Sequence, residues 1–279
     1  PNLRVGISAN FKSKKDKSKN IASHLKAYES FPLDTITVSM DLLLEAEAAG
    51  AALEFPENGV SHIRNRPLVE KSDLTKLKIP DPKMDGRLPV YLEICRDLAS
   101  QIKDSSLGGS ISGPWTLATN LRGAQELIFD TVEDPAFVHE LLRFTTDTIK
   151  VFGLAVRETG VGIGLGEPSA SCSLISPKIY KEFIKPYHQE IVNFFKERKT
   201  FITIHVCGYI DPLMEEMIDL GVGAISLDGP SSLAKMVEVS QKRVAIIGNV
   251  PTTLFEEGTK EEMEQAIRNC LDIAAQGGE

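Results

Sequence analysis

The chain has 279 residues, of which 42% are hydrophobic and 25% charged, and its formal net charge is −8. This suits one large α/β domain or two small ones, while the negative charge and the absence of a basic stripe argue against nucleic-acid binding. No apolar run approaches the roughly 20 residues that cross a bilayer, and no signal-peptide segment is recognisable. The four cysteines show no disulfide spacing. We therefore expect a cytoplasmic enzyme with no membrane or nucleic-acid partner.

The first part of the chain predicts two strand–helix pairs. Apolar and β-branched residues favour strands at 4–8 and 35–39. An amphipathic helix at 21–28 is predicted after the first strand, and a second helix after the other. The second helix, at 42–49, closes on a glycine that can cap it. Because the strand at 35–39 leads into Asp41, we expect a carboxylate at the carboxyl end of a strand.

A surface excursion then interrupts this alternation. Residues 52–55 predict a short extra strand, and the stretch that follows is rich in Pro, Asn and charged residues. We interpret 52–87 as an excursion from one domain, not as a linker between two, because helical patterning resumes at once in 88–103. The sequence therefore predicts a single domain over residues 1–279.

Small residues mark the next two strands. The strand at 107–112 leaves room for a backbone or ligand to lie close, and a helix starts at Pro114. Trp115, at this turn, is either a pocket wall or a packing residue. The strand at 161–166 has alternating glycines without the G-x-x-G continuation of a dinucleotide loop. We therefore expect these glycines to leave space inside a tight barrel, and the strand ends at Glu167.

The stretch 200–210 is β-branched and aromatic, so it predicts a strand, and this strand ends in His205-x-Cys207. Residues two apart on a strand face the same side, so the imidazole and the thiol emerge together. A neutral nitrogen and a soft thiolate suit zinc. The alternative is a buried structural cysteine beside a core histidine, but the position at the end of a strand favours the metal. In the preceding helix, His188 is expected to be structural.

The last part of the chain predicts two more strands and their helices. The strand at 223–228 ends in an aspartate, and the strand at 244–250 carries Asn249 at its end. Helix 260–275 has apolar residues at helical spacing, which predicts one buried face. Cys270 lies on that face and is expected to pack.

Polar or reactive side chains thus gather at the carboxyl ends of the predicted strands. They are Asp41, Glu167, His205, Cys207, Asp228 and Asn249. In a (β/α)8 TIM-type barrel these ends meet at one mouth, where active sites lie. A doubly wound sheet would gather only those beside a switch point. We therefore predict an α/β fold of the (β/α)8 barrel type, with both faces of its sheet covered.

The predicted strand count is one short of a full barrel. Seven strands are predicted, near residues 4, 35, 107, 161, 200, 223 and 244. The 279 residues end after a helix, where an eighth strand is expected. Either the strand at 52–55 belongs to the barrel or the natural C-terminus lies beyond Glu279, and we favour the second interpretation.

Four segments together resemble a known family. They are Gly113–Ala118 (GPWTLA), Glu167–Ser171 (EPSAS), His205–Gly208 (HVCG) and Ile247–Pro251 (IGNVP). In this order they are similar to the uroporphyrinogen decarboxylase superfamily, and within it to the cobalamin-dependent branch of methylcobamide:coenzyme M methyltransferases. Decarboxylases of the superfamily typically carry an Arg-Gln-Ala-Gly-Arg segment for substrate carboxylates, which is not found in these 279 residues.

The resemblance implies a chemistry and a set of ligands. It implies Zn²⁺ bound by His205 and Cys207, a further cysteine ligand in a segment beyond Glu279, and Glu167 as an oxygen ligand. The implied reaction moves a methyl group from a methylcorrinoid to a thiol such as coenzyme M. Because the chain has no Asp-x-His-x-x-Gly cobalamin signature, we expect the corrinoid to arrive on a partner protein.

Asp41 and Asp228 are expected to act in catalysis by positioning the substrate, and Trp115, Tyr209 and Asn249 are expected to contact it. Two other functions stay open. One is a metal-free decarboxylase of a porphyrinogen, in which Asp41 binds pyrrole N–H groups; the scarcity of arginines at the predicted mouth weighs against it. The other is a barrel with a degenerate site that only binds a corrinoid protein. Neither the methyl acceptor nor the oligomeric state is indicated.

Overall fold

The computed structural model describes residues 6–8, 16–31, 33–56 and 60–275. The chain divides after Gly166 into an N-terminal and a C-terminal compact unit, which are described separately; the single-domain organisation stays a prediction. Within the described ranges, no helix combines the length and the apolar character that a membrane span needs.

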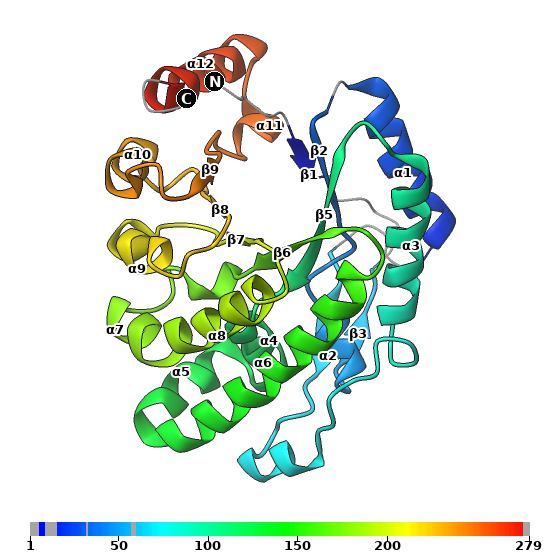
Figure 1. Cartoon of the computed structure of the whole chain (residues 1–279). Helices are drawn as coiled ribbons and strands as arrows, with labels where there is room; N and C mark the ends of the chain where they lie inside the picture. The colour runs from blue at the N-terminus through cyan, green and yellow to red at the C-terminus, as the bar shows by residue number, and fades with distance from the viewer. Residues whose placement is uncertain (1–5, 9–15, 32, 57–59, 276–279) are drawn as a thin grey trace. The chain divides into compact units, whose positions relative to one another are not determined.

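The N-terminal unit alternates parallel strands with helices (Figure 1). Its elements are β1 (Gly6–Ser8), α1 (Lys17–Ser30), β2 (Thr35–Val38), α2 (Leu44–Ala48), β3 (Ala52–Glu54), β4 (His62–Asn65), the 3₁₀ helix η1 (Lys71–Lys76), α3 (Leu88–Gln101), β5 (Ser106–Ser112), α4 (Pro114–Arg122), α5 (Ala124–Glu133), α6 (Pro135–Arg157) and β6 (Gly162–Gly166). Strands β1, β2, β5 and β6 pair in this order, all parallel.

The C-terminal unit continues the same alternation. Its elements are the 3₁₀ helix η2 (Pro168–Ala170), α7 (Pro177–Ile179), the π-helical turn η3 (Tyr180–Ile184), α8 (Lys185–Lys196), β7 (Ile202–His205), the 3₁₀ helix η4 (Asp211–Leu213), α9 (Met214–Ile218), β8 (Ala224–Ser226), α10 (Leu233–Ser240), β9 (Ala245–Ile247), α11 (Leu254–Glu257) and α12 (Lys260–Ala275). Strands β7, β8 and β9 pair in this order, again parallel.

In each unit the parallel strands pair in chain order, without the reversal that defines the switch point of a doubly wound sheet. All seven predicted parallel strands are present. The extra strand β3 instead pairs antiparallel with β4 in a separate sheet of two strands. The interpretation that placed residues 52–55 in the barrel is therefore wrong, because the chain turns back and β4 satisfies the backbone of β3 locally.

Helix α12 corrects another prediction. None of its residues with a described side chain is buried: Met263 and Cys270 are partly exposed, and Ile267 is 43% exposed. The spacing of the apolar residues correctly predicted a helix, but spacing alone does not show how completely neighbouring elements cover its apolar face. Helix α12 packs mainly against α10 and α11, and part of that face stays exposed.

A tyrosine explains why β5 is built from small residues. The Tyr91 hydroxyl, on α3, donates to the Val38 carbonyl of β2 and accepts from the Ser110 N–H of β5, each at 2.8 Å. A Cβ at Gly109 would lie 3.2 Å from that hydroxyl and 2.9 Å from the Val156 side chain. Glycine is therefore required for the tyrosine to reach the strands, and the close approach predicted for this strand is made by a side chain of the same unit.

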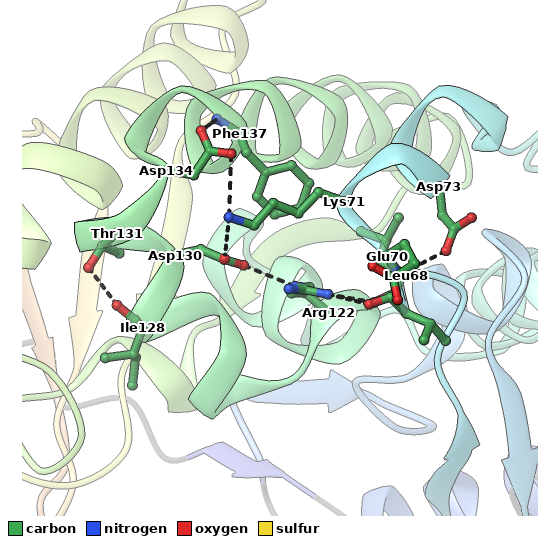
Figure 2. Close-up of polar contacts among 11 residues, drawn as sticks. Leu68, Glu70, Lys71, Asp73, Arg122, Ile128, Asp130, Thr131, Asp134 and Phe137 are labelled. Atoms are coloured by element: carbon green, nitrogen blue, oxygen red, sulfur yellow. Dashed lines mark hydrogen bonds and ion pairs between the residues drawn. The ribbon is translucent and has the colours of Figure 1, made fainter.

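An ion-pair cluster fastens the excursion to the helices of the N-terminal unit (Figure 2). Asp130 of α5, whose side chain is 3% exposed, lies 2.9 Å from Lys71 Nζ and 2.9 Å from Arg122 Nε. Arg122 also donates to the Val69 carbonyl at 2.6 Å. Lys71 lies 3.3 Å from Asp134, the N-cap of α6. One buried carboxylate thus joins the excursion to α4 and α5.

We expect Asp130→Ala to lower the free energy of unfolding by about 3 kcal/mol, because it leaves the guanidinium of Arg122 without its buried partner. Asp134→Ala is the matched control: its side chain is 40% exposed, and loss of the N-cap should cost about 1 kcal/mol. Urea unfolding followed by circular dichroism measures both. Equal losses for the two variants would show that Asp130 does not join these elements.

Candidate functional site

The C-terminal unit brings the predicted imidazole and thiol together. His205 is the last residue of β7, and Cys207 lies just beyond the strand's end. His205 Nε2 is 3.1 Å from Cys207 Sγ, and His205 Nδ1 is 3.0 Å from Ser226 Oγ. Parallel pairing sets Ser226 of β8 opposite His205, so the register of the two strands places this hydroxyl.

These partners define the protonation of the pair. Burial lowers the pKa of His205, although the Ser226 contact and the charge of Asp228 oppose it. Burial raises the pKa of Cys207, and the charge of Asp228 adds to the rise. Near neutral pH the imidazole is therefore neutral and the thiol protonated. Nδ1–H donates to Ser226, and the Cys207 S–H donates to the Nε2 lone pair.

Asp228 fixes the loop after Cys207. Its carboxylate accepts from the Gly208 N–H at 2.8 Å and from the Gly229 N–H at 2.7 Å. Gly208 has φ +78°, and a Cβ there would lie 2.7 Å from Ser173 Oγ, so glycine is needed on both counts. Asn249 donates to the Asp228 carbonyl at 3.2 Å and to the Ser231 carbonyl at 2.6 Å. Asp228 thus holds the backbone next to Cys207, and Asn249 holds the backbone of Asp228 and Ser231.

Tyr209 and Glu167 both lie close to this pair in the structure, but the first is exposed to solvent and the second is buried. Tyr209 follows Gly208 and is 42% exposed, with its N–H donating to Ser173 Oγ at 3.1 Å. Glu167 is fully buried; its N–H donates to the His205 carbonyl at 2.8 Å, and its carboxylate lies 2.9 Å from His188 Nε2.

The pair fits two of the ligands of a zinc ion. A separation of 3.1 Å between Nε2 and Sγ is one that a single ion with bonds of roughly 2.0 and 2.3 Å can bridge. Within the residues that the structure describes, no group of three or more His, Cys, Asp or Glu side chains is arranged to hold a metal. Among these residues the spacing of His205 and Cys207 suits two metal ligands, and Glu167 is not grouped with them; the metal-ligand roles of all three stay predictions.

The other two predicted residues belong to the N-terminal unit. Asp41, just after β2, makes a two-pronged ion pair with Arg87 at 2.9 and 3.1 Å. It also accepts from the Leu43 N–H at 3.0 Å and from Ser61 Oγ at 3.4 Å. Trp115 is fully buried in α4, which favours packing over a pocket wall. Their roles in catalysis and substrate binding stay predictions.

A second buried carboxylate lies near Asp41. Glu45 of α2 is fully buried, accepts from the Ser112 N–H at 2.8 Å and contacts Ser112 Oγ at 2.9 Å. Burial raises the pKa of Glu45 to about 7, with the charge of Asp41 adding a smaller part. Ser112 Oγ also donates to the Leu42 carbonyl at 3.0 Å, so a protonated Glu45 can donate in turn to that hydroxyl.

This carboxylate predicts stability that falls as the pH rises. The folded-state pKa of Glu45, about 7, lies above the ordinary value of 4.5, so between these values the folded state binds more protons than the unfolded state. The free energy of unfolding should therefore fall by about 3 kcal/mol from below pH 4.5 to above pH 7 through this group alone. Urea unfolding at pH 5 and pH 8 should show a smaller fall for Glu45→Gln, whereas Glu140→Gln, at an exposed site, should match the unmodified protein.

The sequence analysis did not predict several of these partners, although the sequence indicates one of them, Ser226. Ser226 lies two residues before Asp228 on the same predicted strand, so the two side chains are expected to face the same side. Nothing in the sequence indicates the contact of Arg87, because it lies 46 residues from Asp41 within a segment interpreted as surface. The contacts from Tyr180 to His188 and from His188 to Glu167 were not predicted, because they depend on the π-helical turn η3.

Comparisons with known proteins identify the family to which these residues belong. The sequence profile of the family described as Uroporphyrinogen decarboxylase (URO-D) matches residues 6–279. The Methylcobamide:CoM methyltransferase MtbA of Methanosarcina mazei is 29% identical over 249 residues, 86% of this chain and 71% of that protein. The Uroporphyrinogen decarboxylase of Xylella fastidiosa is 26% identical over 265 residues, 91% of this chain and 73% of that protein.

A solved structure gives the fold. The methyltransferase from Methanosarcina mazei superposes with a TM-score of 0.86 at 22% identity, covering 100% of this chain and 86% of that one. Together with the parallel strands paired in chain order, this likeness confirms the predicted α/β fold of the TIM-barrel type.

Proposed function

The chain belongs to the uroporphyrinogen decarboxylase family, and from that premise we propose that it is an enzyme that transfers a methyl group from a methylcorrinoid to a thiol. One observation carries the proposal: an imidazole nitrogen lies 3.1 Å from a thiol sulfur at the carboxyl end of a parallel strand. In TIM-type barrels this end of the strands forms the active site. A relative named as a methylcobamide:CoM methyltransferase supports the same reaction class.

His205 and Cys207 would hold a zinc ion at this point. When bound, zinc makes a coordinated thiol ionise near neutral pH, so that the sulfur becomes a nucleophile. The chain's own residues prepare the ligands: Ser226 accepts a hydrogen bond from the Nδ1–H of His205, which leaves the Nε2 lone pair facing Cys207. Such a partner on the far nitrogen is the usual device that fixes the tautomer of a ligating histidine.

In the proposed reaction the sulfur of the acceptor attacks the methyl carbon of the methylcorrinoid. A C–S bond forms, the cobalt–carbon bond breaks with its electron pair staying on the corrinoid, and the proton of the acceptor thiol goes to solvent. Coenzyme M is the acceptor suggested by the relatives' names. We propose that the corrinoid comes on a separate protein and that the reaction takes place in the cytoplasm.

The remaining residues around the pair receive positioning roles. Asp228 holds the Gly208 N–H next to Cys207, and Asn249 holds the carbonyls of Asp228 and Ser231. We propose that the two residues together keep the Cys207 sulfur aimed at the His205 nitrogen. Tyr209 presents a partly exposed ring beside Gly208, which suits contact with the substrate.

A metal-free decarboxylase is the alternative, since uroporphyrinogen decarboxylases are also relatives. That reaction assigns Asp41 to the pyrrole N–H groups of the substrate. In the structure both Asp41 oxygens already accept hydrogen bonds from Arg87, and one also accepts from Leu43. A carboxylate with these partners has little capacity left for pyrrole donors, so the geometry favours the methyltransferase.

The test is a transfer assay with purified, zinc-loaded protein, methylcob(III)alamin and coenzyme M. We expect methylated coenzyme M and the absorption change of a demethylated corrinoid, both dependent on zinc. Decarboxylation of uroporphyrinogen without metal would support the alternative instead. Binding of a corrinoid protein without turnover of either substrate would mean that the chain is a binding subunit.

A further inference from the structure

Three buried polar side chains form a line behind the end of β7. Glu167, His188 and Tyr180 are each fully buried. His188 Nε2 lies 2.9 Å from Glu167 Oε1, and His188 Nδ1 lies 3.3 Å from the Tyr180 hydroxyl. A carboxylate accepts hydrogen bonds, so the Nε2–H of His188 donates to Glu167, and Nδ1 faces the tyrosine hydroxyl. One imidazole thus serves both contacts at once.

The π-helical turn makes this line possible. In a regular α-helix, residues eight apart point about 80° away from each other. The π turn at Tyr180–Ile184 inserts one extra residue, so Tyr180 and His188 are separated by about two full turns and share a face. The two rings pack edge to face, with centroids 5.8 Å apart. Such a turn costs regular hydrogen bonding and is frequent at functional sites.

The line reaches the candidate metal ligand through the backbone. The Glu167 N–H donates to the carbonyl of His205 at 2.8 Å. Because His188 fixes the side chain of the same residue, Glu167 is held at both its side chain and its main chain. The position of the His205 carbonyl, and with it the start of the loop to Cys207, therefore depends on the buried line.

We propose that His188, supported by Tyr180, is a positioning residue for the metal-binding end of β7, acting through Glu167. This assigns Glu167 a role behind the ligands instead of a bond to the metal. The proposal rests on the proposed function, because it assumes that His205 and Cys207 bind zinc. Its mechanism is the fixing of ligand geometry by hydrogen-bonded groups behind the ligands, which in known sites changes metal affinity by about 10–100-fold.

The experiment measures metal binding by the full chain, with no turnover involved. Zinc affinity is obtained by competition with a chelating dye, and Co²⁺ replaces zinc to give sulfur-to-cobalt absorption bands that report the ligand geometry. The variants are His188→Leu, which removes the donor to Glu167, His188→Gln, which restores a donor, and Tyr180→Phe. Phe183→Leu is the control, because Phe183 is buried in the same π turn and has no role in the proposed line.

We expect His188→Leu to weaken zinc binding about 10–100-fold and to shift the cobalt bands, His188→Gln to recover most of both, and Tyr180→Phe to give a smaller loss. Phe183→Leu should lower stability and leave affinity and bands unchanged. If His188→Leu does not fold, Tyr180→Phe and His188→Gln decide by the same two readouts. Unchanged affinity in the His188 and Tyr180 variants overturns the positioning role and leaves the proposed function intact, whereas an unmodified protein that binds neither metal overturns both.

Discussion

Cys207→Ala is expected to abolish zinc binding and methyl transfer while leaving the fold in place. The unmodified protein should carry about one zinc per chain, and the variant close to none, because the substitution removes the only sulfur within 3.1 Å of His205 Nε2 among the described contacts. Removing a residue behind a ligand already costs about 10–100-fold, so we expect methyl transfer to fall by at least about 100-fold. Metal analysis and the transfer assay measure the two effects.

Cys172→Ala is the matched control for this prediction. Cys172 is also a partly buried cysteine, and burial raises the pKa of its thiol as it does for Cys207. Its backbone N–H donates to the Tyr209 carbonyl at 2.9 Å, a bond that alanine keeps. The control should retain zinc and activity. Full zinc content in Cys207→Ala, or equal losses in both variants, would contradict the assignment of the metal to the His205–Cys207 pair.

The strands and the proximity of His205 and Cys207 could be predicted because the sequence patterns that indicate them are local. Continuous β-branched and apolar runs mark each parallel strand, and the two-residue spacing of His205 and Cys207 indicates one face whether or not the strand continues to the second residue. The strand in fact ends at His205, yet the two side chains still meet. Zinc itself came from the resemblance and from ligand chemistry, and it stays a prediction.

The remaining features depend on contacts between distant residues or on backbone irregularity. Regular helical periodicity predicts that Tyr180 and His188 point in different directions, and only the π turn aligns them. The apolar residues of α12 likewise have helical spacing, and the face that they form was wrongly predicted to be buried. A sequence pattern does not reveal which elements cover a face. Arg87 illustrates the third case: charge pairing across 46 residues has no periodic signature.

We expect Arg87→Met to destabilise the N-terminal unit by about 3–5 kcal/mol, the cost of leaving a buried charge without its partner. Arg87 lies 2.9 Å from Asp41 and 2.6 Å from Glu47, and its guanidinium stacks 4.8 Å from the centre of the Phe55 ring. The side chains of Arg87 and Asp41 are only 11% and 7% exposed. Urea unfolding near neutral pH measures the loss.

Two further variants separate the ion pair from lost packing. Arg243→Met removes an exposed arginine that lies 3.0 Å from Asp219, with both side chains about half exposed, and such pairs contribute less than about 1 kcal/mol. Adding Asp41→Asn to Arg87→Met removes the unpaired carboxylate, so the double variant should be more stable than Arg87→Met alone. If Arg87→Met costs no more than Arg243→Met, or if the second substitution lowers stability further, the pair does not hold Asp41 in place, and the carboxylate is then available to substrate donors as the decarboxylase alternative requires.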